Sequence, residues 1–195
     1  MDALENGFFV LPRIPGTIEP VEFPAAGDEA GVRGVWSPAS SSYHANAVGG
    51  VRLGADSADE VIDEVQEHFR SRDCAYQWFF APTRATPDDL GARLERAGIA
   101  KAGESAGLYV TDLQIGAEPN PDIEVIEAHE GDPLQDALSV FARGFPIPPD
   151  VASLMAEAMI ALGGRHYVAY LDGEPISAAV MFAMRPGKPA MVLPP

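Results

Sequence analysis

The sequence predicts an α/β fold in which a mixed β-sheet is flanked by helices. Runs of apolar residues switch between strand-like and helical spacing along residues 46–183. Helix starts are marked by Ser, Thr or Asp, with acidic residues or proline close behind. An Asp172-Gly173 pair separates two apolar runs, which is the pattern of a β-hairpin. A chain of 195 residues that is 47% hydrophobic is long enough to bury a substantial core.

Residues 1–45 are rich in Pro, Gly, Ser and Ala. Four prolines break any long regular element here: Pro12, Pro15, Pro20 and Pro24. Short apolar pieces such as Val32 to Trp36 remain between the breaks. We therefore expect an irregular lead-in over 1–45 that contains one or two strands.

The block 46–115 is predicted to run β-α-β-α-β. Its first strand, 46–53, precedes Ser57-Ala-Asp-Glu60, a capping box in which the Ser hydroxyl and the Glu carboxylate satisfy free amides at a helix start. That helix extends to about Arg70, and its apolar residues share one face: Val61, Ile62, Val65 and Phe69.

The second half of this block holds an aromatic-rich strand, a helix and a further strand. The strand is expected at 75–80. The helix is expected to begin at Pro87, with Thr86 as its cap, and to end in a left-handed conformation at Gly98. A strand at 107–113 completes the block.

Residues 116–121, Gly-Ala-Glu-Pro-Asn-Pro, have the composition of a linker. The block 122–183 that follows is predicted to run β-α-α-β-β. Its expected elements are a strand at 123–126, helices that begin near Asp132 and Asp150, and strands at 165–171 and 175–183 joined by the Asp-Gly turn. Residues 184–195 are expected to form a short proline-rich tail.

The charge balance excludes two classes of partner. Thirteen Lys and Arg residues against 29 Asp and Glu residues give a formal net charge of −16. A surface of this sign repels nucleic-acid phosphates and anionic lipid headgroups, so neither nucleic acid nor a membrane is an expected partner. It attracts a cationic small-molecule amine, although acidity also serves solubility.

Localisation and redox state follow from the N-terminus and from cysteine usage. The segment from Met1 to Asn6 is acidic, unlike the basic start of a secretory signal. Cys74 is the single cysteine and has no internal disulfide partner. A reducing, cytoplasmic setting is therefore expected, with Cys74 as a structural thiol.

Few residues form a pattern that carries chemistry by itself. The four histidines, at positions 44, 68, 129 and 166, lack the spacing of zinc ligands, so no metal site is expected. No Gly-x-Ser-x-Gly motif marks a serine hydrolase. We expect His166, on a strand, to be a core-edge histidine.

The segment His166-Tyr-Val-Ala-Tyr-Leu-Asp-Gly-Glu-Pro-Ile-Ser-Ala-Ala-Val180 resembles the second and third strands of the GNAT-type N-acetyltransferases. In that family a first strand and two successive helices precede this antiparallel pair, so 122–183 resembles the opening half of a GNAT domain. The block 46–115 resembles the later half of such a domain in degenerate form, and some members of the family carry two modules in tandem. The resemblance implies a GNAT-like mixed sheet and acetyl transfer from acetyl-CoA to an amine.

The resemblance does not extend to the segment that grips acetyl-CoA. In the family a fourth strand leads into a Gln/Arg-x-x-Gly-x-Gly/Ala loop and a helix, whose converging amides hold the diphosphate. After Ala183 no such loop is recognisable. The weak candidates for cofactor binding are Arg52, Gly54 and Ser57, between a strand and a helix, although Asp56 and Asp59 would oppose an anion there.

Three interpretations of the function follow. In the first, the chain is a GNAT-like N-acetyltransferase that is truncated or weakly active. In the second, it is a non-catalytic small-molecule-binding or regulatory protein that retains the fold. In the third, it is a truncated product, as the change to Arg-Pro-Gly-Lys-Pro at the expected fourth strand suggests. Catalytic residues are not assigned.

Two further expectations concern a pocket and the assembly. Asn46, Trp78 and Tyr109 are candidates for the wall of a substrate pocket, because each lies on a strand expected to be central. The two blocks are expected to complete one GNAT-like sheet, which would cover the exposed edge of the strand at 175–183. A homodimer is left open.

Overall fold

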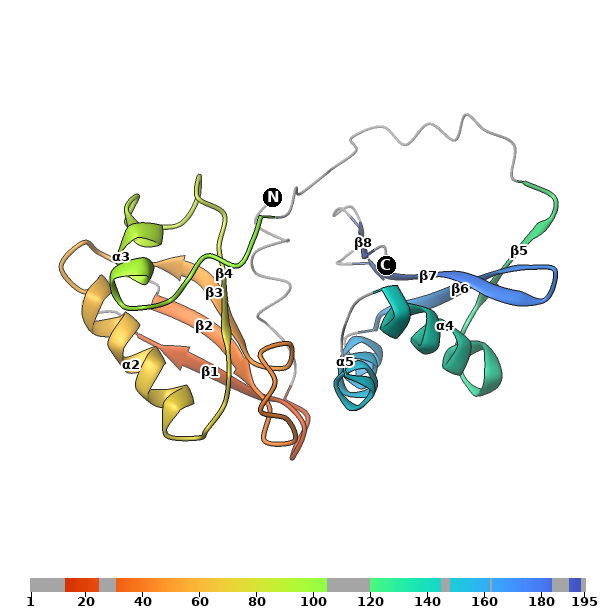
Figure 1. Ribbon diagram of the computed structural model, residues 1–195, viewed down its shortest axis with the longest axis horizontal. Coiled ribbons are helices and arrows are strands. Elements are labelled where there is room, and N and C mark those ends of the chain that lie inside the picture. The colour runs from red at the N-terminus through yellow and green to blue at the C-terminus, as the bar shows by residue number, and fades with distance from the viewer. Residues whose placement is uncertain are drawn as a thin grey trace.

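The computed structural model describes residues 13–24, 31–104, 120–144, 148–161, 163–183 and 190–193. These residues form two four-stranded sheets with helices packed against them (Figure 1). The first sheet has the order β1-β2-β3-β4 and the second has the order β5-β6-β7-β8. This confirms the predicted α/β class. We call residues 13–104 the first module and residues 120–193 the second module.

The first sheet is mixed. Strands β1 (Glu19–Phe23), β2 (Gly31–Trp36) and β3 (Ala47–Arg52) are antiparallel, and β4 (Gln77–Phe79) pairs with β3 in parallel. Two of these strands lie within the expected lead-in 1–45, so that region supplies half of the first sheet. Pro20 is accommodated because β1 pairs with one neighbour only among the described strands.

Helix α2 (Ala58–Arg70) buries the face that its spacing predicts. Val61, Ile62, Val65 and Phe69 are at most 4% exposed and pack against Val48 and other residues of the sheet. Burial of each such side chain is worth about 1.5–3 kcal/mol. The expected capping box is wrong, because Ser57 makes no side-chain capping bond and its hydroxyl donates to the carbonyl of Gly54 at 3.4 Å.

Helix α3 (Leu90–Arg96) starts three residues later than predicted. Thr86 is engaged elsewhere: its carbonyl and its hydroxyl oxygen both accept from the amide of Leu53, each at 3.1 Å. Thr86 therefore extends the pairing beside β3 instead of capping a helix. The helix ends as predicted, with Gly98 at φ +84°. The strand expected at 107–113 and the linker up to residue 119 lie outside the described residues.

The second module follows the predicted order. Strand β5 (Ile123–Glu127), helices α4 (Gly131–Gly144) and α5 (Pro149–Ala161), and strands β6 (Arg165–Leu171) and β7 (Glu174–Ala183) succeed one another along the chain. Asp172 and Gly173 have φ values of 53° and 81°, which confirms the tight hairpin between β6 and β7. Helix α4 packs on β6 and β7 around a core that includes Val140, Val168 and Ala178.

The expected tail contributes a strand. Residues 190–193 form β8 (Ala190–Leu193), which pairs antiparallel with β7 and covers its edge. The described strands of the two sheets do not pair with one another, so the described residues form two sheets and not the one sheet that was expected. The modules instead meet through α5, whose Val151, Leu154 and Ala158 form a buried cluster with Ile18, Val35 and Ala45 of the first module.

Candidate functional site

An open groove of about 530 Å³ lies at the C-terminal end of α2. We call it the Ser41–Tyr76 groove. Its lining is mixed, with hydroxyl, amide, guanidinium, carboxylate and thiol groups on Ser41, Gln66, Arg70, Asp73, Cys74 and Tyr76, together with Ala75. The groove has the size of a small-molecule site.

One rim of the groove is positioned by Asn46. This side chain is fully buried, and its Nδ2 donates to the carbonyls of Ser40 at 2.9 Å and Ser42 at 2.8 Å. Its Oδ1 accepts from the amide of Ser37 at 2.8 Å. The carbonyl of Ser41, between the two carbonyls that Asn46 holds, accepts from the amide of Ala75 at 2.9 Å. Asn46 thus shapes the groove without lining it.

The inner wall of the groove is aromatic. The ring of Tyr76 stacks on Phe69 with centroids 4.5 Å apart and an interplanar angle of 8°. Burial raises the pKa of the Tyr76 phenol, and the Trp78 indole, the Arg70 charge and the Gln66 amide oppose the rise. Tyr76 Oη and Trp78 Nε1 are both buried and make no close hydrogen bond within the described ranges, although the Trp78 indole and the Gln66 amide both act on the Tyr76 phenol.

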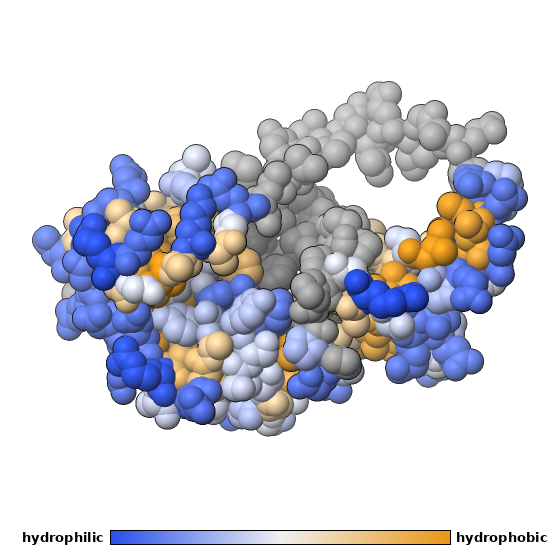
Figure 2. All heavy atoms as spheres, in the orientation of Figure 1, coloured by the Kyte–Doolittle hydropathy of each residue, from blue (hydrophilic) through white to orange (hydrophobic). Residues whose placement is uncertain are grey.

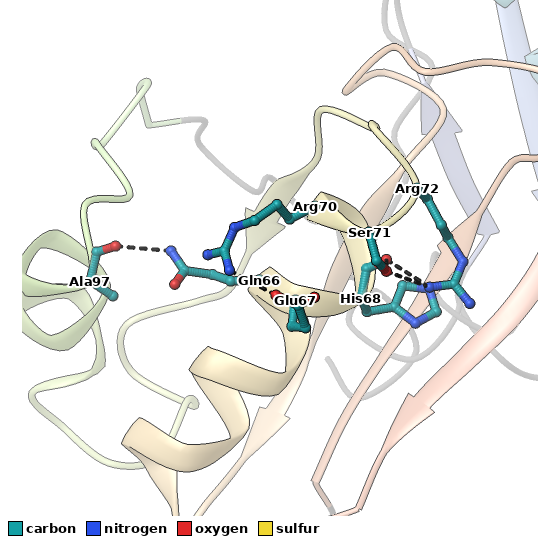
Figure 3. A network of polar contacts seen from close by, with 7 residues as sticks. All are labelled: Gln66, Glu67, His68, Arg70, Ser71, Arg72 and Ala97. Carbon is teal, nitrogen blue, oxygen red and sulfur yellow. Dashed lines mark hydrogen bonds and ion pairs between the residues drawn. The ribbon is translucent and has the colours of Figure 1, made fainter.

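Polar contacts hold the helix end beside the groove (Figure 3). Gln66 Nε2 donates to the carbonyl of Ala97 at 2.9 Å and so ties α2 to the end of α3. Arg70 pairs with Glu67 at 2.8 Å on the same helix. These contacts keep Gln66 and Arg70 on the groove side of α2, four residues apart and therefore on one face of the helix.

Arg72 and His68 close the other side of this helix end. Arg72 Nη1 donates to the carbonyl of His68 at 2.7 Å, and its guanidinium lies 5.0 Å from the centre of the Trp36 ring. Burial lowers the pKa of the His68 imidazole, and the Arg72 charge lowers it further. Cys74 donates its thiol hydrogen to the carbonyl of Arg72 at 3.3 Å, in keeping with a structural thiol.

The candidates Arg52, Gly54 and Ser57 come together in one loop, at the carboxyl end of β3 and the start of α2. This places them about 20 Å from the groove along the 13-residue helix. Arg52 Nη1 donates to the carbonyl of Val51 at 2.7 Å, and Ser57 donates to Gly54.

This loop does not fit a diphosphate. The first turn of α2 carries Asp59 and Glu60, and Asp56 lies in the loop itself. Each acid near an anion opposes binding by roughly 1 kcal/mol at such a partly exposed position. Arg93 lies 2.9 Å from Asp59, which places its charge on that carboxylate.

Of the remaining predicted wall residues, the structure describes only Trp78. Trp78 is half-buried on β4 and packs with Phe80 against the core, whereas Phe79 on the opposite face is 46% exposed. The predicted alternation is confirmed, but β4 lies at an edge of the sheet that the described strands form and is not central. Tyr109 lies outside the described residues.

Three of the residues that line the groove were not predicted from the sequence: Gln66, Arg70 and Tyr76. The spacing of the two helical residues and the alternation of Tyr76 with Trp78 were visible in the sequence. What was missing was the position of the loop around Ser41, which becomes a rim only when Asn46 folds it back over Ala75.

Within the described ranges, no cluster of three or more His, Cys, Asp or Glu side chains is arranged to hold a metal ion. No helix in that part of the chain has the length and apolar character needed to cross a bilayer. Comparisons with known protein families, with curated proteins and with solved structures find no match to this chain.

Proposed function

We propose that the chain is a GNAT-type N-acetyltransferase-like protein, of the class that transfers an acetyl group from acetyl-CoA to a small-molecule amine. The observation that supports this proposal is the connectivity of the second module. One strand, two helices and an antiparallel pair with a tight Asp172-Gly173 turn succeed one another, in the sheet order β5-β6-β7-β8. The opening half of the resembled domain has the same succession of elements.

Strand β8 occupies the position of the fourth strand in this scheme. In the resembled family the diphosphate loop follows that strand. The loop at Arg52, Gly54 and Ser57 in the first module does not replace this diphosphate loop. Acidic residues surround it, and Arg52 and Ser57 donate hydrogen bonds to backbone carbonyls of the same segment. We therefore expect acetyl-CoA binding that does not depend on Arg52.

A second candidate function is non-catalytic binding of a small molecule in the Ser41–Tyr76 groove. The observation that favours it is the mixed lining of that open groove, where the Gln66 amide and the Arg70 guanidinium lie beside the Tyr76 phenol. These polar groups can orient a small ligand against the ring of Tyr76.

Calorimetric titration with acetyl-CoA distinguishes the two candidates. Binding at micromolar concentrations in both the wild-type chain and Arg52→Ala supports the acetyltransferase proposal with a site outside the Arg52 loop. If the wild-type chain binds acetyl-CoA and Arg52→Ala does not, the loop around Arg52 in the first module holds the coenzyme. No heat at millimolar acetyl-CoA overturns the proposal for this chain.

A small-amine library, screened by thermal shift, tests the groove. A hit that stabilises the wild-type chain but not Tyr76→Phe supports binding there. Tyr43→Phe is the matched control, because Tyr43 is 47% exposed and does not line the groove. Equal shifts in all three proteins would rule out the groove.

A further inference from the structure

Helix α5 contacts both modules. One side of the helix presents Val151, Leu154 and Ala158 to the first module. Another side presents Ala152, Met155, Ala156 and Met159 to a small cavity against α4, β6 and β7. In Figure 1 the helix lies on the side of the second module that faces the first. A change that displaces α5 from the second sheet therefore also weakens the contact between the two modules.

The cavity behind α5 contains a buried histidine. Its volume is about 10 Å³, enough for about one water molecule. His166 of β6 lines this cavity, is only 5% exposed, and has no hydrogen-bond partner for Nε2 among the described residues. The other lining residues are apolar: Ala137, Leu138, Phe141, Ala152, Met155, Ala156, Met159, Ala178, Ala179 and Val180.

The charged groups on the neighbouring elements are turned to other partners or to the surface. On α4, Asp136 accepts from Tyr170 Oη at 2.7 Å and Arg143 donates to the carbonyl of Pro175 at 3.3 Å. On α5, Asp150 and Glu157 are exposed. On β5 and β6, Glu127 and Arg165 pair with each other, and His129 is 74% exposed beside Glu127. None of the described residues that line the cavity is a carboxylate, so none of them can compensate a charge on His166.

We propose that His166 makes the seating of α5 sensitive to acid: its imidazole takes up a proton when α5 opens, so acid favours the form in which α5 is released from the sheet and the contact between the modules is loosened. A charge on the ring has no partner in the cavity, and burying an unpaired charge is strongly unfavourable. Opening of α5 lets water reach the ring, so the proton is accepted in the open form.

The direction of the pH dependence follows from burial. Burial lowers the pKa of His166 below its ordinary value of 6.5. The seated form is therefore fully favoured well above pH 6.5, where the imidazole is neutral in both forms. As the pH falls below 6.5 the open form binds a proton that the seated form does not, and the advantage of the seated form declines until the folded pKa is reached.

Amide hydrogen exchange along α5 in the full chain tests this inference. The opening equilibrium is measured at about pH 7.5 and at about pH 5.5, with each rate divided by the intrinsic rate of that amide. Opening of α5 in the wild-type chain is expected to rise by up to about tenfold per pH unit below 6.5. The amide of Val48, in the core of the first module, is the internal reference.

Two variants decide the outcome. In His166→Leu, which removes the titrating group, the opening of α5 is expected to lose its pH dependence. His166→Gln serves the same purpose if the leucine variant does not fold. His129→Gln, at an exposed histidine, should keep the wild-type pH dependence. An unchanged pH dependence in the His166 variants would overturn the inference, and so would its loss in His129→Gln alone.

Discussion

The side-chain oxygen of Asn46 accepts a hydrogen bond from the backbone amide of Ser37 at 2.8 Å, and both residues are at most 1% exposed. The Ser37 hydroxyl in turn donates to the carbonyl of Thr17 at 2.7 Å. One amide side chain therefore closes the loop between β2 and β3, and that loop forms the rim of the Ser41–Tyr76 groove.

Asn46→Ala is expected to destabilise the chain by about 3 kcal/mol, because it leaves a buried amide and two carbonyls without their partner. Urea unfolding measures the loss. Asn120→Ala is the control: Asn120 accepts from the Asp122 amide on the exposed surface, and its removal should cost less than about 0.5 kcal/mol. Similar losses in both variants would contradict the role of Asn46.

Substitution by alanine at Gly34 and at Gly91 should change the stability of the protein in opposite directions. A Cβ on Gly34 would overlap the carbonyl oxygen of Ala47 and lie 2.6 Å from Val48 Cγ1 on the neighbouring strand. Gly34→Ala is expected to cost about 2 kcal/mol or more, since the strand backbone must shift. Gly91 lies in α3, with Phe80 at 3.8 Å, and alanine there should stabilise by about 0.5–1 kcal/mol. Thermal unfolding of both variants checks the sign.

The phenol of Tyr170 should lose its proton at a higher pH than an ordinary tyrosine. Its hydroxyl donates to Asp136 Oδ2, and this bond is the main cause that raises the pKa of Tyr170 to about 12. Because the folded pKa lies above the ordinary value of 10, the contribution of this bond to stability is present below pH 10 and is lost as the pH rises towards 12. Ultraviolet titration, with Tyr170→Phe as the difference reference, should show a lower pKa in Asp136→Asn. An unchanged midpoint would refute the coupling.

The strands of the second sheet expose apolar side chains that suit self-association. Val125 is 63% exposed, Ile176 46% and Leu171 36%, and Figure 2 shows hydrophobic atoms gathered over the β5 region. If the chain forms a homodimer through this surface, Val125→Asp should weaken it, whereas Tyr43→Asp, in the first module, should not. Sedimentation across a range of concentrations measures the effect. A wild-type chain that stays monomeric throughout would exclude such a dimer.

The sequence alone determined the elements whose signals are local. The apolar face of α2 through Val61, Val65 and Phe69 follows from helical spacing, and the β6–β7 turn follows from Asp172-Gly173. In both cases the side chains within a few residues decide the backbone conformation. The pattern of the second module was therefore predicted to within a few residues.

Only the tertiary structure decided which distant groups become partners. Thr86 looks like a helix cap in the sequence, but it pairs with Leu53, and Asn46 looks like a pocket wall, but it bonds to Ser37. Strand β8 was unrecognised because proline-rich surroundings hid a short strand that is defined by pairing with β7. The physical reason is the same in each case: a long-range hydrogen bond or apolar contact forms only where the rest of the fold excludes water and brings its two halves together.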